Sequence, residues 1–60
     1  MRLYIVNVDG VLYPIRSETR NLAVLQAIEQ SVNDTNNVPS ETPFCVGCYT
    51  NTGRFVKLIK

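Results

Sequence analysis

The sequence predicts an α+β fold in which two β-hairpins form an antiparallel sheet and one helix packs on a face, in the order ββαββ. Two observations favour it. Paired runs rich in β-branched and aromatic residues lie near each end of the chain, and apolar residues at helical spacing lie between them. We expect all 60 residues to form one small domain. A domain of this size buries only about 60% of its unfolded surface, so its stability is marginal.

The first hairpin is predicted from residues 2–8 and 11–16, which flank Asp9 and Gly10, a strong two-residue turn signal. Such a turn sets the register and pairs the residues of the expected core face: Val8 with Val11, Val6 with Tyr13, and Tyr4 with Ile15. Pro14 has no backbone donor, which places the second strand at an edge of the sheet.

A helix is predicted between the hairpins, with Ser17 as its N-cap, Glu18 as its first residue and an end near Val32. Its expected apolar stripe is Leu22, Leu25, Ile28 and Val32. The predicted core comprises Val6, Val8, Tyr13, Ile15, Leu22, Leu25, Ile28, Val46, Val56 and Leu58. Truncation of Leu25 or Ile28 to Ala is therefore expected to cost roughly 2 to 5 kcal/mol.

A loop of some ten residues follows the helix, because residues 33–43 contain poor helix formers and two prolines. Loops of this length in compact domains tend to be functional or mobile. Asn36 and Asn37 are therefore candidate partner-binding residues.

The second hairpin is predicted from residues 44–49 and 54–59, with Gly53 in a left-handed turn position. Strict alternation places two apolar sets on opposite faces: Phe44, Val46, Val56 and Leu58 on one, and Cys45, Tyr49, Phe55 and Ile59 on the other. One helix can cover only one face. We therefore expect Tyr49, Phe55 and Ile59 to bind a protein partner or a second copy of the chain.

The composition and charge of the chain indicate which kinds of partner it can bind and in which cell compartment we expect it. Apolar residues make up 45% of the chain and charged residues 18%, a balance typical of globular domains. The net charge of +1 provides no long-range field for a polyanion, so it does not support nucleic-acid binding. No secretory signal and no apolar run of roughly 20 residues is present, so we expect a cytoplasmic protein without membrane contact.

Cys45 and Cys48 have the C-x-x-C spacing of redox dithiols and half zinc sites. No helix is predicted after Cys48 to lower a thiol pKa, and without His or further Cys one chain cannot complete a zinc site. In an extended strand the two side chains point to opposite faces, about 10 Å apart, which excludes a disulfide. We expect inert thiols, no metal and no cofactor. A metal shared between two chains, or a disulfide made by a bend at Gly47, remains an alternative.

Residues 4–13 resemble the first motif of the haloacid-dehalogenase-like phosphatases, an apolar strand followed by two acidic positions. The resemblance implies a nucleophilic Asp at the first position and an acid/base Asp at the second. Here the first is Asn7, an amide that cannot attack phosphorus, and only Asp9 matches. The family also requires a doubly wound sheet, for which the rest of the chain is too short. A hairpin turn explains Asp9 and Gly10 without that chemistry.

Residues 3–8 are similar to the shorter ribonucleoprotein motif of RNA-recognition domains, and residues 53–58 to the longer one. The resemblance implies that Tyr4 stacks on a base. In that family a helix directly follows the first strand, whereas a second strand is predicted here. The hairpin register also places Tyr4 on the core face.

The sequence contains no His to activate a Ser or Cys, and its carboxylates fall in predicted turns, loops or the helix surface. We therefore expect no catalytic residues and no enzyme activity. The leading hypothesis is a small protein-binding regulator or inhibitor that forms a homodimer. It is comparable in size to phage-encoded host-takeover proteins and antitoxins.

Two other functions stay open. The first is nucleic-acid binding on an open sheet, through the aromatics Tyr4, Tyr13, Tyr49 or Phe55 together with basic residues. These basic residues are Arg2, Arg16, Arg20, Arg54, Lys57 and Lys60. The second is a homodimer bridged by a metal that Cys45 and Cys48 of both chains bind.

Overall fold

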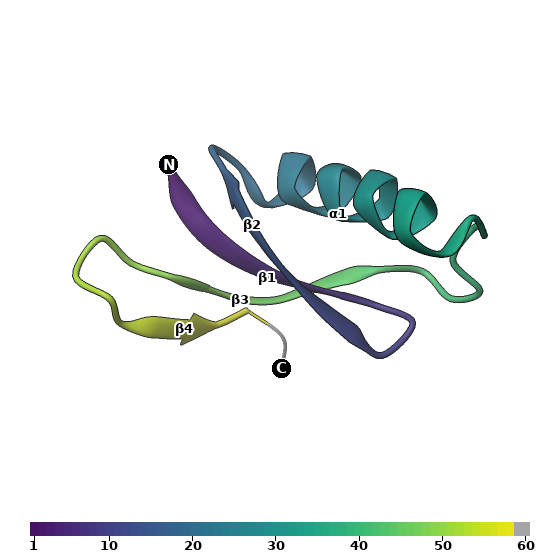
Figure 1. Ribbon diagram of the computed structural model, residues 1–60. Helices are drawn as coiled ribbons and strands as arrows, with labels where there is room; N and C mark the ends of the chain where they lie inside the picture. Colours follow the sequence, from purple (N-terminus) through teal and green to yellow (C-terminus); the bar gives the residue numbers. More distant parts are fainter. Residues whose placement is uncertain (59–60) are drawn as a thin grey trace.

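The computed structural model describes residues 1–58 and shows one helix packed on one four-stranded antiparallel sheet (Figure 1). The elements are β1 (Arg2–Val8), β2 (Val11–Ser17), α1 (Arg20–Thr35), β3 (Phe44–Tyr49) and β4 (Phe55–Lys57). The strand order in the sheet is β2-β1-β3-β4, so β1 of the first hairpin pairs with β3 of the second. This arrangement confirms the predicted α+β class and the ββαββ order.

The first hairpin has the predicted register. Asp9 and Gly10 have φ angles of 52° and 85°, the two positive values that a type I′ turn requires. Val8 pairs with Val11 across this turn, and the predicted pairs continue along both strands. β2 lies at an edge of the sheet, as the proline at position 14 indicated.

The hydrophobic core lies between α1 and the inner face of the sheet, which is the face that α1 covers. Its buried side chains are Tyr4, Val6, Val8, Tyr13, Ile15, Ala23, Ala27, Cys45 and Cys48. Val6 and Val8 on the central strand β1 are the most completely enclosed large side chains. The core residues predicted in the first hairpin are thus confirmed: Val6, Val8, Tyr13 and Ile15.

The predicted start of the helix is wrong. Ser17 is the last residue of β2, where it pairs with Arg2 and is buried. The N-cap is Thr19, whose Oγ1 accepts a hydrogen bond of 3.2 Å from the backbone N–H of Leu22. Since pairing with β1 extends β2 through Ser17, the helix begins later than the first capping residue suggested.

The predicted helix face and the predicted end are also wrong. Ala23, Ala27 and Ser31, spaced by four residues, are the buried positions of α1. Leu22 and Leu25 are 46% and 62% exposed, and Ile28 and Val32 are half-buried. Small side chains allow the helix backbone to approach the sheet closely, which turns the leucines outward. The helix continues past Val32 and ends at the left-handed Asn36.

The second hairpin contributes less to the core than predicted. α1 contacts β1, β2 and β3 but not β4. Val56 on β4 is therefore 41% exposed, while Val46 and Leu58 are half-buried. Gly53 has a φ of 85°, which confirms the predicted left-handed turn position. Within residues 1–58 no helix is long and apolar enough to cross a membrane.

Two substitutions on α1 test which face of the helix packs on the sheet. Ala27→Leu inserts three carbon atoms at a position with 0% exposure, so it should cost about 1 to 3 kcal/mol. Leu25→Ala removes an exposed side chain and should change stability by less than about 0.5 kcal/mol. Urea unfolding followed by circular dichroism measures both. A large loss for Leu25→Ala with tolerance of Ala27→Leu would show that the helix is rotated.

Candidate functional site

The sheet face opposite α1 is the candidate functional site, and we call it the outer face. The strand registers place apolar side chains from all four strands on it: Leu3, Ile5, Leu12, Pro14, Phe44, Tyr49 and Phe55. α1 packs on the inner face, and residues 1–58 contain no second helix that could cover the outer one (Figure 1). The outer face is therefore an apolar surface in contact with solvent.

An aromatic pair lies at the β3–β4 end of the outer face. Tyr49 pairs with Phe55 across the hairpin, and their ring centroids lie 5.1 Å apart with a tilt of 58°. Both side chains remain exposed, at 39% and 42%. The Phe55 ring also lies over Gly47, where an added Cβ would come within 2.5 Å of Phe55 Cζ. The glycine thus provides the space in which the Phe55 ring packs on the sheet.

A β-bulge in β3 changes which residues reach each face. Val6 pairs with Cys45 and Ile5 pairs with Gly47, which makes Val46 the extra residue. Before the bulge the alternation is therefore the reverse of the predicted one. Cys45 faces inward, not toward Tyr49, and Phe44 faces outward, where it is 43% exposed. The predicted assignment of Cys45 and Phe44 is wrong, although Gly47 within a strand was a signal for a bulge.

The two cysteines consequently lie on the same face and both belong to the core. The prediction that they point to opposite faces is wrong. Both are free thiols, and they are only 5% and 4% exposed. Burial raises the pKa of the Cys45 thiol above its ordinary value of 9.0, and its Sγ lies 3.4 Å from the Gly47 carbonyl oxygen as a hydrogen-bond donor. A neutral, enclosed thiol is a poor nucleophile and a poor metal ligand.

Potential metal ligands do not gather in the described part of the chain, where no three His, Cys, Asp or Glu side chains form a group. The carboxylate of Asp9 instead accepts backbone hydrogen bonds. Its Oδ2 accepts from Ser40 N and its Oδ1 from Glu41 N, both at 2.9 Å. These bonds connect the first hairpin turn to the loop after α1. Sequence reasoning missed this role, because nothing near Asp9 in the chain indicates a partner more than 30 residues away.

Asn36 is the C-cap of α1 and Asn37 follows it, and the C-terminal end of α1 lies at the other end of the molecule from the β3–β4 turn (Figure 1). Asn36 ends the helix with a φ of 59°, and its N–H donates to the Val32 carbonyl at 2.7 Å. Asn37 is bonded to Thr35 through its backbone N–H and its side-chain amide, each at 3.2 Å. The structure therefore does not bring the two predicted groups of partner-binding residues together. Ile59, predicted to belong with Tyr49 and Phe55, lies outside the described residues.

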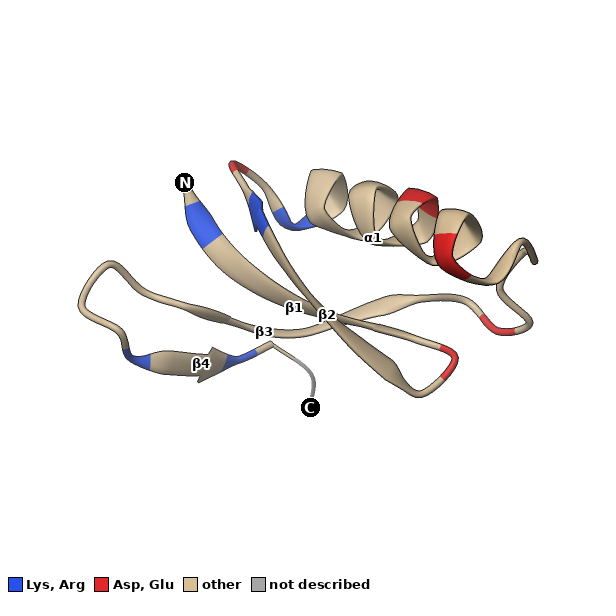
Figure 2. Ribbon diagram, in the orientation of Figure 1, with Lys and Arg blue, Asp and Glu red and all other residues tan. Residues whose placement is uncertain are grey.

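The basic residues of the nucleic-acid hypothesis fall into two groups (Figure 2). Arg2, Arg16 and Arg20 lie at the end of the sheet that holds the N-terminus, and Arg54 and Lys57 lie on and beside β4. Lys60 is beyond the part of the chain that the structure describes. Tyr4 and Tyr13 are buried, so neither side chain can stack on a base. Of the four sheet aromatics proposed to stack on bases, only Tyr49 and Phe55 are accessible.

Searches for similar proteins found no matching family, no matching curated protein and no matching solved structure.

Gly47→Ala tests the packing of Phe55 on the outer face. The new Cβ would lie 2.5 Å from Phe55 Cζ and 2.6 Å from the Val56 carbonyl oxygen, so the ring or the β4 backbone must move. We expect a loss of about 1 to 3 kcal/mol in urea unfolding. Gly47→Ala in a Phe55→Ala background separates the two contacts, because only the backbone clash remains. A Gly47→Ala variant as stable as the wild type would contradict this packing.

Asp9→Asn tests the connection between the hairpin turn and the loop. Asn tolerates the positive φ at this position, but its amide nitrogen cannot accept a hydrogen bond. One of the two backbone bonds is lost, at a cost of about 0.5 to 1.5 kcal/mol. Amide hydrogen exchange at Ser40 or Glu41 should accelerate, whereas Glu41→Gln should leave the exchange at Ser40 unchanged. Equal protection in Asp9→Asn and wild type would refute the role of the carboxylate.

Proposed function

We propose that this chain is a small protein-binding regulator that binds through its outer face. The observation that carries the proposal is the set of apolar side chains on that face, contributed by every strand of the sheet. Five of them are exposed: Leu12, Pro14, Phe44, Tyr49 and Phe55. Several exposed apolar side chains on one face of so small a domain are typical of a protein interface. Two features of the sequence also support a regulatory role: the small size of the chain, and the expectation that it has no catalytic residues.

The occupant of the outer face that the charges favour is a second copy of the chain. The basic residues Arg2, Arg16 and Arg20 lie at one end of the sheet, with Glu18 between two of them. Acidic residues gather at the opposite end: Asp9, Glu29, Asp34 and Glu41 (Figure 2). In a two-fold stack of outer faces with the molecules running in opposite directions, Arg16 of one chain lies near the Asp9 end of its partner. The charges of α1 lie on the other side of the sheet and do not contribute to this pairing.

A homodimer of this kind also compensates for the size of the domain. A 60-residue chain buries a smaller fraction of its unfolded surface than a larger domain does, and this fold leaves the apolar outer face uncovered. Stacking two outer faces adds a second apolar layer that both chains share. Stability then depends on protein concentration.

Nucleic-acid binding is the second candidate, and one observation favours it. Arg16, Tyr49 and Leu3 line a shallow hollow of about 390 Å³ beside the β3–β4 turn. A guanidinium and an accessible aromatic ring in the walls of one hollow can hold single-stranded nucleic acid by charge and stacking. This binding would weaken steeply with salt, whereas an apolar protein interface would respond little. The metal-bridged dimer has no such support, because Cys45 and Cys48 are enclosed in the core.

Leu12→Glu and Phe55→Glu test the outer face. Sedimentation equilibrium of the wild type at micromolar concentration should give a species near twice the 6.8 kDa chain mass, and each variant should sediment as a monomer. Leu12 is the milder test of folding because it does not pack over Gly47. Val38→Glu is the matched control, since Val38 is an 81% exposed apolar residue of the loop after α1.

The outcomes separate the candidates. A wild-type dimer that Val38→Glu preserves and the outer-face variants lose supports the proposal. A monomeric wild type that binds single-stranded RNA with a steep salt dependence, and loses that binding in Arg16→Ala, establishes the alternative instead. A monomeric wild type with neither behaviour, and outer-face variants of unchanged stability, overturns the role of the outer face.

A further inference from the structure

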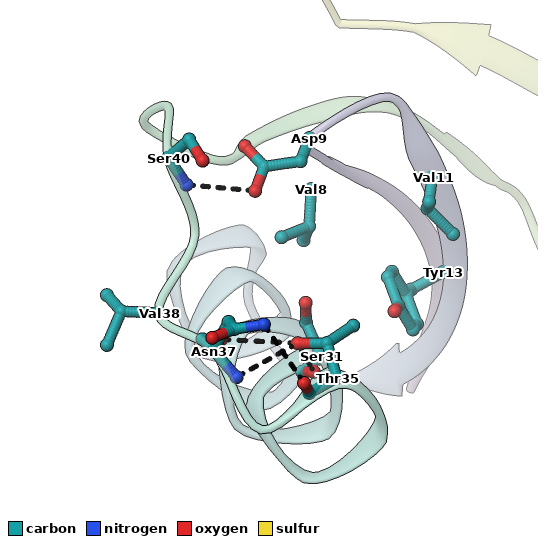
Figure 3. A pocket seen from close by; sticks show the side chains of 9 residues that line it. All are labelled: Val8, Asp9, Val11, Tyr13, Ser31, Thr35, Asn37, Val38 and Ser40. Atoms are coloured by element: carbon teal, nitrogen blue, oxygen red, sulfur yellow. Dashed lines mark hydrogen bonds between the residues drawn. The ribbon is translucent and has the colours of Figure 1, made fainter.

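A cavity of about 400 Å³ lies between the tip of the first hairpin and the C-terminal end of α1 (Figure 3). Its lining residues are Val8, Asp9, Val11, Tyr13, Ser31, Thr35, Asn37, Val38 and Ser40. Val8 and Tyr13 belong to the inner face, so the cavity lies on the other side of the sheet from the outer face. Its volume is in the range of sites that bind small molecules.

Three elements form the walls, and hydrogen bonds hold them in place. The first hairpin supplies Val8, Val11 and Tyr13. α1 supplies Ser31 and Thr35, and the following loop, which includes Val38, closes the third side. Asp9 fixes the loop through Ser40 N and Glu41 N. Thr35 Oγ1 donates to the Ser31 carbonyl at 2.9 Å and accepts from Asn37 N, which fixes the helix end. The cavity is therefore defined by the fold and is not a gap beside a free loop.

Two hydroxyl groups in the wall have no hydrogen-bond partner among residues 1–58. Tyr13 and Ser31 are 8% and 6% exposed, and the bond between Ser31 and Thr35 uses the Ser31 carbonyl. No dashed line in Figure 3 ends on the Tyr13 hydroxyl. Neither oxygen is enclosed, since Ser17 Oγ is the sole enclosed side-chain polar atom without a partner in the described part. Both side chains are more than nine-tenths buried and line the cavity, and their hydroxyl oxygens stay accessible to solvent.

The charged residues around the cavity determine whether it favours a positively or a negatively charged ligand. Asp9 is in the wall, and no Lys or Arg lines the cavity. Glu41 follows the lining residue Ser40 directly, and Asp34 precedes the lining residue Thr35 on the last turn of α1. An anionic ligand would be repelled, whereas a cation would be stabilised by the Asp9 carboxylate.

We propose that this cavity binds a small aliphatic amine. The ammonium group lies at Asp9, polar hydrogens or hydroxyls of the ligand meet the Tyr13 and Ser31 hydroxyls, and the carbon chain contacts Val8 and Val11. The proposal is independent of protein binding through the outer face, because the cavity and the outer face lie on opposite sides of the sheet. Its volume leaves room for a ligand that displaces on the order of a dozen waters.

Three four-carbon probes that differ only in their end groups test the charge: 1,4-diaminobutane, 1,4-butanediol and succinate. Each is titrated to millimolar concentration into isotope-labelled full-length chain and followed by two-dimensional NMR of the backbone amides. The diamine should shift the amides of Val8, Tyr13, Ser31 and Thr35 saturably. The diol should bind at least tenfold more weakly, and succinate should cause no saturable shift.

Tyr13→Phe and Ser31→Ala test the two hydroxyls. Each variant removes one oxygen without changing an apolar wall, and each should weaken diamine binding about three- to tenfold. Tyr4→Phe and Ser17→Ala are matched controls, because they remove the same groups from buried positions that do not line the cavity. Both controls should retain wild-type affinity.

Several results would overturn the proposal. Equal shifts with all three probes would show that the cavity does not discriminate charge. Absence of any saturable shift with the diamine would show that no amine of this size binds there. Shifts confined to the outer face, or equal weakening in the hydroxyl variants and their controls, would place the binding elsewhere. None of these results depends on the oligomeric state of the chain.

Discussion

The type I′ turn at Asp9 and Gly10 is the constraint on which most of this fold depends. Positive φ at both residues matches the twist of the flanking strands and leaves one register available to the hairpin. That register directs Tyr4, Val6, Val8, Tyr13 and Ile15 to the inner face, where they make up five of the nine buried core residues described. The Asp9 carboxylate then binds the loop after α1, so the same turn also positions a wall of the cavity.

The extra residue in β3 has a comparable influence on the second half of the sheet. With Val46 unpaired, Cys45 and Cys48 lie opposite Val6 and Tyr4, and both thiols are enclosed under α1. Phe44 is turned to the outer face by the same irregularity. One bulge therefore removes the reactive groups from the surface and enlarges the apolar area available for a partner.

The buried alanines of α1 determine how the remaining surfaces are divided. Ala23 and Ala27 bring the helix close to β1, β2 and β3, while β4 stays beyond its reach. The cavity lies on the inner face, near the C-terminal end of α1, and the apolar side chains of the outer face stay exposed. A protein partner and a small ligand would thus use separate sides of the sheet, which allows each proposal to be tested without the other.

The sequence alone determined the elements of this fold but not the way they meet. Turn chemistry and period-two alternation are local properties, so the first hairpin, its register, the edge position of β2 and the left-handed Gly53 were predictable. The presence of Tyr49 and Phe55 on one face also followed from alternation, because the bulge lies before them in β3. The presence of the helix was predictable as well, although its cap was displaced when strand pairing extended through Ser17.

Only the tertiary structure decided which helix face is buried, which face Cys45 occupies, and what Asp9 binds. The spacing of Leu22 and Leu25 competed with that of Ala23 and Ala27, and close approach to the sheet favoured the smaller pair. A bulge depends on the partner strand, and the contacts of Asp9 join residues more than 30 positions apart. The cavity arises where three elements meet, so no segment of the chain carries a local signal for it.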